Sequence, residues 1–126
     1  MNDLPPKNSE QNALWNGPGG RAWVEAQDVL ERMLEPFELL LVEAVAAEAP
    51  RRVLDVGCGM GGTTVALSRR LGSEARCTGV DISEPMLAVA RARAAGEPIS
   101  PTFVVADAQT HAFEPASFDA VVSRFG

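Results

Sequence analysis

Histidine, cysteine and tyrosine, three side chains often used in metal sites or in acid–base chemistry, are scarce in this chain. The 126 residues include no tyrosine, one histidine and two cysteines. Neither cysteine has companions at the spacing of a metal site, so we expect no metal centre. The absence of tyrosine excludes any mechanism that needs a phenolic hydroxyl from these residues.

The two cysteines, Cys58 and Cys77, are not expected to form a disulfide. Cys58 follows the first predicted strand and Cys77 begins its parallel neighbour, which places them about 13 Å apart along the sheet. A disulfide requires Cα atoms within about 7 Å of each other. Free thiols are compatible with a reducing compartment, and we expect a cytoplasmic location.

Long apolar runs and an excess of basic residues are also absent. No run approaches the roughly 18 apolar residues that a membrane span requires, and residues 1–12 lack the apolar centre of a secretory signal. The 11 Lys and Arg residues are outnumbered by 17 Asp and Glu, so the net charge is −6. We therefore expect no membrane span and no nucleic-acid partner.

The most informative segment is 53–64, Val-Leu-Asp-Val-Gly-Cys-Gly-Met-Gly-Gly-Thr-Thr. An apolar strand runs into a glycine-dense turn, with Asp55 two positions before the first glycine. Glycine removes Cβ atoms that would hold a nucleotide off the backbone, and it permits positive φ. A second predicted strand ends at Asp81, 19 residues after Gly62, where a carboxylate can accept hydrogen bonds from both ribose hydroxyls. The pattern indicates an adenosine-containing ligand.

Strand and helix patterns alternate along the chain, which predicts an α/β fold with a parallel sheet. We expect strands over residues 53–57, 76–81, 102–106 and 118–123. We expect helices over residues 20–34, 36–49, 63–71 and 84–95. Pro36 is predicted to divide the first two helices, and Ser83 to cap the last one.

Four segments in register carry a resemblance to a known family. They are Asp55 within 53–59, Gly-Val-Asp-Ile-Ser at 79–83, Ala-Asp-Ala at 106–108 and Ser-Phe-Asp-Ala-Val-Val-Ser at 117–123. Residues 50–126 resemble the class I, Rossmann-like S-adenosylmethionine-dependent methyltransferases. Upstream, residues 15–23 are similar to the opening segment of a small-molecule branch, of the kind found in ubiquinone and menaquinone biosynthesis.

The resemblance implies a doubly wound Rossmann-like sheet with strand order 3-2-1-4, covered by amino-terminal helices. Methyltransferases of this class carry seven strands, so these four are expected to be the amino-terminal portion. We expect residues 1–12 to form a disordered lead-in, residues 13–50 the covering helices and residues 51–126 the cofactor-binding half. An uncovered sheet face and an unpaired strand edge favour self-association of this portion.

The resemblance also implies S-adenosyl-L-methionine as the cofactor and a small-molecule methyl acceptor. Asp81 is expected to bind the ribose, with Ile82 beside the adenine, while Asp107 accepts from the adenine amino group, with Ala108 beside the ring. The full set of expected cofactor-binding residues is Asp55, Gly57, Cys58, Gly59, Gly61, Thr63, Thr64, Asp81, Ile82, Asp107, Ala108, Ser123 and Trp15. Thr63 and Thr64 are expected to meet the cofactor carboxylate.

Several alternatives stay open at this level. The glycines also suit a tight turn, Asp81 and Asp107 also suit capping and turn roles, and Trp15 also suits helix packing. His111 lies in a polar loop near the expected site, and no residue is assigned as catalytic. The alternatives in function are an NAD(P)-dependent oxidoreductase with the same glycine fingerprint and a truncated, non-catalytic binding module.

Overall fold

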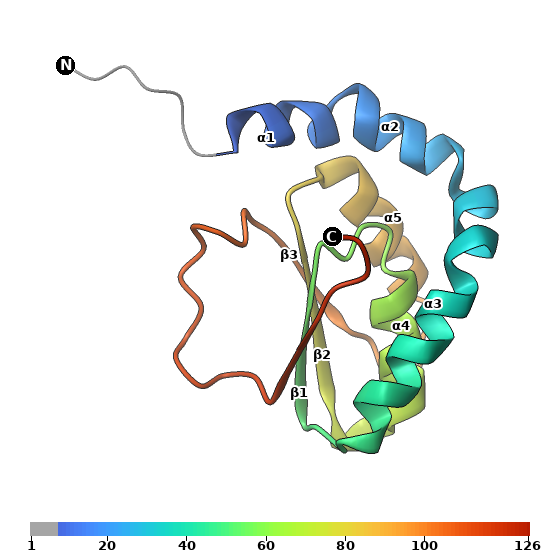
Figure 1. Ribbon diagram of the computed structural model, residues 1–126, viewed down its shortest axis with the longest axis vertical. Coiled ribbons are helices and arrows are strands. Elements are labelled where there is room, and N and C mark those ends of the chain that lie inside the picture. Colours follow the sequence, from blue (N-terminus) through green and yellow to red (C-terminus); the bar gives the residue numbers. More distant parts are fainter. Residues whose placement is uncertain (1–7) are drawn as a thin grey trace.

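The computed structural model describes residues 8–126, which form a parallel sheet with helices along one side (Figure 1). The elements, in chain order, are α1 (Ser9–Asn16), α2 (Pro18–Glu25), α3 (Gln27–Ala47), β1 (Arg52–Val56), α4 (Gly62–Leu71), η1 (Gly72–Glu74), β2 (Arg76–Asp81), α5 (Glu84–Ala94), β3 (Thr102–Val105) and β4 (Ala120–Val122). No helix within this described range is long and apolar enough to cross a bilayer.

The sheet has the order β3-β2-β1-β4, and every neighbouring pair is parallel. This confirms the predicted α/β class and strand order. In register, Val56 of β1 pairs with Val80 of β2, and Asp81 pairs with Val105 of β3. Because all four strands run the same way, their carboxyl ends meet at one edge, where ligands bind in open α/β sheets.

The hydrophobic core lies between the sheet and the helices. Val53 and Cys77 are register partners on neighbouring strands, so they face the same side of the sheet. They pack with Leu67 of α4 and with Val42 and Val45 of α3 in one buried cluster. The alternate residues face the other side, where Figure 1 shows the segment between β3 and β4 rather than a helix.

The predicted helix break at Pro36 is wrong. Pro36 lies inside α3, which runs unbroken for 21 residues, and the break falls instead at Ala26. An interior proline costs a helix about 3 kcal/mol. Tertiary contacts anchor α3 on both sides of the proline: Glu31 pairs with Arg93 before it, and Val42 and Val45 are buried after it. These contacts offset the local cost and hold both segments in one helix.

The predicted disordered lead-in is wrong for residues 9–12, which belong to α1. The helix is held by contacts that composition does not reveal: Asn16 donates to Ile82 O (2.7 Å) and accepts from Glu84 N (2.8 Å). Ser83 Oγ also donates to Trp15 O. Asn8 directly precedes this helix, and the rest of that prediction, residues 1–7, lies outside the described residues.

Candidate functional site

The loop after β1 is held in a shape that requires glycine. Gly57, Gly59 and Gly61 have φ values of +68°, +56° and +81°, a region that L side chains rarely adopt. Gly57 N and Cys58 N both donate to Val80 O, at 2.9 and 3.1 Å. The loop is therefore fastened to β2 by its own backbone.

Asp81 lies at the end of β2 and joins this loop to the start of α5. Its Oδ2 accepts from Gly59 N and its Oδ1 from Ser83 N, each at 2.8 Å. An ionised carboxylate has about four acceptor positions, so two remain for a ligand. Ser83 caps α5 as predicted, because its hydroxyl accepts from Met86 N at 3.4 Å.

Asp55 lies beneath the loop as a support. Its side chain is 2% exposed and accepts from Thr64 Oγ1 at 2.8 Å. Burial raises the pKa of Asp55 to about 6, while the Thr64 hydrogen bond and the positive charge of Arg124 oppose this rise. The predicted contact of Thr64 with a ligand carboxylate does not fit, because its hydroxyl is buried and donates to Asp55.

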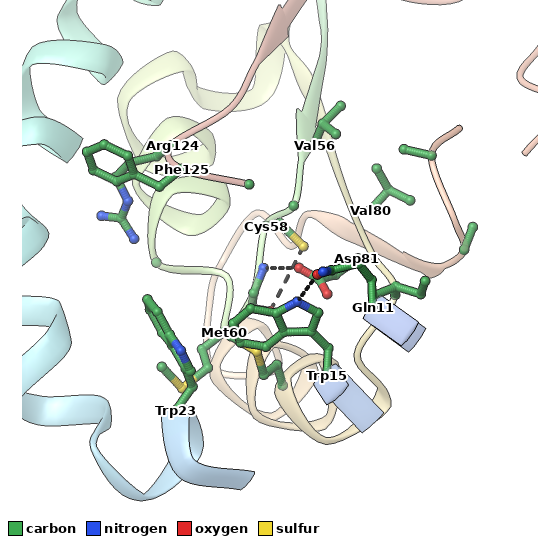
Figure 2. A pocket seen from close by; sticks show the side chains of 18 of the residues that line it. Gln11, Trp15, Trp23, Val56, Cys58, Met60, Val80, Asp81, Arg124 and Phe125 are labelled. Atoms are coloured by element: carbon green, nitrogen blue, oxygen red, sulfur yellow. Dashed lines mark hydrogen bonds between the residues drawn. The ribbon is translucent and has the colours of Figure 1, made fainter. Parts of the chain in front are cut away.

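A cavity of about 370 Å³ opens at the carboxyl ends of the strands (Figure 2). This volume lies within the usual range for small-molecule sites. The predicted residues that line it are Trp15, Gly57, Cys58, Gly59, Asp81, Ile82, Asp107 and Ala108.

Five predicted residues do not line the cavity: Asp55, Gly61, Thr63, Thr64 and Ser123. Ser123 Oγ donates to Val56 O at 2.8 Å and so joins the end of β4 to β1. Thr63 is 3% exposed. Asp55 and Thr64 support the loop from beneath, a role that a linear motif cannot distinguish from ligand contact.

The roof of the cavity comes from the amino-terminal helices. Trp15 and Trp23 pack edge to face with ring centroids 5.9 Å apart, and Gln11 accepts from Trp15 Nε1 at 2.9 Å. Leu30 and Leu34 of α3 add apolar surface. The amino-terminal helices therefore contribute apolar side chains to the cavity, while Asp81 and Asp107 contribute carboxylates at the strand ends.

Sequence reasoning missed the residues that follow β4. Arg124 and Phe125 line the cavity, and Figure 2 shows them on the other side of Cys58 from Asp81. A signal was available, because they directly follow the last predicted strand and all carboxyl ends of a parallel sheet share one edge. The other lining residues missed were Asn8, Gln11, Leu30, Glu31, Leu34, Val56, Met60, Gly62, Val80, Met86, Ala106, Gln109 and Gly126.

Asp107 marks the opposite end of the cavity. Its carboxylate accepts from Asn8 Nδ2 at 3.1 Å and from Gln109 N at 2.9 Å. His111 packs on Phe113, with ring centroids 4.5 Å apart, and does not line the cavity. This position gives no support to a catalytic role for the histidine.

Both cysteines, Cys58 and Cys77, are buried free thiols. Burial raises the pKa of the Cys58 thiol far above its ordinary value and that of Cys77 to about 11. Cys58 lines the cavity as a neutral, packed side chain rather than as a nucleophile.

This arrangement fits an adenosine-bearing ligand. Carboxylates end β2 and β3, where donor groups of a ribose and a base can reach them. The loop after β1 presents glycine backbone to the cavity, and Ile82 and Ala108 offer apolar surfaces beside Asp81 and Asp107. The chain can hold such a ligand across the strand ends.

Comparison with known proteins agrees with this geometry. Residues 53–126 match the family described as methyltransferase domain. The chain is 36% identical over 104 residues to demethylmenaquinone methyltransferase of Thermus thermophilus, an alignment that covers 79% of this chain and 47% of that protein. The chain thus spans about half the length of this relative.

Solved structures show the same fold. Phosphoethanolamine N-methyltransferase 2 of Haemonchus contortus, in complex with phosphomonomethylethanolamine and S-adenosylhomocysteine, is 40% identical with a TM-score of 0.53, over 58% of this chain and 17% of that one. Magnesium protoporphyrin IX methyltransferase of Synechocystis superposes with a TM-score of 0.73 over 91% of this chain and 57% of that one. At 22% identity, the latter match concerns the fold alone.

Proposed function

Because this chain belongs to the methyltransferase domain family, we propose that it is the cofactor-binding part of an S-adenosylmethionine-dependent methyltransferase. The observation that carries the proposal is the cavity itself, where Asp81 lies beside the positive-φ glycine loop at the carboxyl edge of the sheet. S-adenosylhomocysteine in the Haemonchus relative, at 40% identity, supports the same cofactor here.

The described side chains divide the binding task among the strand ends. We assign the ribose hydroxyls to Asp81, whose two remaining acceptor positions suit two donors. Asp107 accepts from the adenine amino group, while Ile82 and Ala108 flank the ring. The hydrogen bonds that Asp81 already makes to Gly59 N and Ser83 N hold its carboxylate in place before a ligand arrives.

The methyl group of bound S-adenosylmethionine is already activated by its sulfonium sulfur. The chain then has to align an acceptor with that group and exclude water, which lowers the barrier by several kcal/mol through positioning. Trp15, Trp23 and Leu34 supply an apolar wall for this purpose. No protein nucleophile is required, in agreement with the neutral thiol of Cys58.

The acceptor is proposed to be a small molecule. The relatives carry names for methylation of demethylmenaquinone and phosphoethanolamine, both small compounds. We also propose a cytoplasmic location, because the two buried cysteines are unbridged. The family match favours this function over the nicotinamide-dependent alternative.

Calorimetry with separate ligands tests the proposal. We expect S-adenosylmethionine and S-adenosylhomocysteine to bind and NAD to give no signal. Tighter binding of NAD would overturn the assignment. If S-adenosylmethionine binds but its methyl group is not transferred to any small acceptor, the result would instead favour the non-catalytic binding module.

A substitution of Asp81 tests the ribose contact. Asp81→Ala removes two charge-assisted hydrogen bonds, together worth about 3 kcal/mol or more, so affinity for S-adenosylhomocysteine should fall about a hundredfold. Asp119→Ala is the matched control, because Asp119 also accepts from two backbone N–H groups, those of Arg51 and Arg52, each at 2.9 Å. These lie at the amino end of β1, so affinity should be unchanged.

A further inference from the structure

Arg124 is the one cationic residue among the described residues that line the cavity. We propose that Arg124 binds the carboxylate at the amino-acid end of the cofactor and so fixes the direction in which the cofactor lies. This inference rests on the proposed function, because it assigns an additional contact to the same ligand. It adds a residue that none of the sequence motifs pointed to.

Charge along the cavity follows the strand order. Asp107 comes after β3, Asp81 ends β2, the uncharged glycine loop follows β1, and Arg124 comes after β4. In S-adenosylmethionine the adenosine and the amino-acid carboxylate lie at opposite ends of the molecule. The adenosine end has donor groups that can bind the two aspartates. The amino-acid carboxylate of the cofactor then lies at the end of the cavity where Arg124 lies (Figure 2).

The guanidinium of Arg124 has donor capacity to spare. Its Nη1 donates to Glu38 Oε2 at 3.1 Å, and its side chain is 17% exposed. Within residues 8–126, its buried Nε has no hydrogen-bond partner. A buried donor left without a partner costs about 1–3 kcal/mol, and a carboxylate can satisfy two guanidinium N–H groups at once.

Glu38 of α3 marks where such a carboxylate can sit. Its Oε2 lies 3.4 Å from the position of a Cβ built on Gly62, the first residue of α4, and Arg93 Nη1 lies 3.2 Å from the same position. Free N–H groups at the start of a helix favour anions. The carboxylate of Glu38 lies beside the start of α4 while it pairs with Arg124. A ligand carboxylate would compete with Glu38 for the same cation.

Two probes separate this contact from the rest of the site. S-adenosylhomocysteine carries the amino-acid carboxylate, whereas 5′-methylthioadenosine has the same adenosine thioether without it. Arg124→Met should weaken binding of S-adenosylhomocysteine by at least about tenfold, the loss of one charge-assisted contact, and leave 5′-methylthioadenosine unaffected. Glu38→Gln should strengthen S-adenosylhomocysteine binding, because it removes the competing charge.

The control is Arg70→Met. Arg70 pairs with Glu43 of α3, the helix that also carries Glu38, and neither residue lines the cavity, so this variant removes an ion pair to α3 without changing the site. We expect unchanged affinity for both probes. Equal weakening of both probes by Arg124→Met, or weakening of neither, would overturn the inference and leave the proposed function standing. A wild-type protein that binds neither probe would overturn both.

Discussion

The two faces of the sheet differ in how they are covered. On one face, Val53 is 0% exposed and packs against Leu67, which is also 0% exposed, beneath α3 and α4. On the other face, Leu54 is 5% exposed, yet its register partner on β4, Val121, is 64% exposed. Figure 1 shows α3, α4 and α5 along a single side of the strands, with α1 and α2 beyond the carboxyl ends of the strands.

This difference shows that an apolar pattern along a strand does not by itself establish that the side chains are buried. β1 reads as a strand buried on both faces, and β4 carries apolar residues on both faces as well. The described residues supply helices for one face only. The second face keeps apolar side chains that the sequence pattern treats as core.

The largest expected effect tests the covered face. Leu67→Ala should lower the free energy of unfolding by about 3 kcal/mol or more, because it leaves a cavity in a fully buried cluster. Val121→Ala, the matched truncation on the other face, should change it by less than about 0.5 kcal/mol. Denaturant unfolding of both variants measures the contrast. Equal losses would mean that Val121 is covered in solution.

The next effect concerns Asp55, a carboxylate within the covered face. Its folded-state pKa of about 6 lies above its ordinary value of 3.8, so protonation stabilises the fold. The contribution of Asp55 protonation to the free energy of unfolding is fully present below the ordinary pKa of 3.8 and is lost as the pH rises through about 6. Asp55→Asn removes it, since the amide carries no charge.

Unfolding measured at about pH 4.5 and about pH 7.5 tests this. The difference in stability between wild type and Asp55→Asn should shift by roughly 2 kcal/mol, in favour of wild type at the lower pH. The pKa of Asp119 is lowered by the N–H groups of Arg51 and Arg52, so its contribution to stability changes with pH in the opposite direction. Because Asp119 is present in both proteins, this contribution cancels in the comparison. Parallel pH profiles would show that Asp55 does not titrate as its burial implies.

The smallest expected effect on stability tests the uncovered face. We predict that the isolated 126-residue chain self-associates through this face or the edge of β4. Val121→Glu should reduce association, seen by light scattering, with little change in stability. Val29→Glu is the control, because Val29 is similarly exposed, at 59%, but lies on α3. A monodisperse wild-type chain would contradict the prediction.

Local patterns were enough to predict several parts of the fold. The glycine loop, the strands around it and the cap at Ser83 depend on residues close together in sequence. Backbone φ preferences and strand alternation act at that range. The strand order was confirmed too, through the resemblance of four motifs in register rather than through any one of them.

What only the tertiary structure decided depends on contacts between distant residues. The continuity of α3 through Pro36, the docking of α1 by Asn16 and the pairing of Arg124 with Glu38 are of this kind. The energy of such a contact belongs to the pair, so neither residue by itself reveals its partner. The sequence by itself determined the glycine loop and the two acids, Asp81 and Asp107, that line the cavity. Folding decided which residues close around it, since packing brings together side chains that no local pattern links.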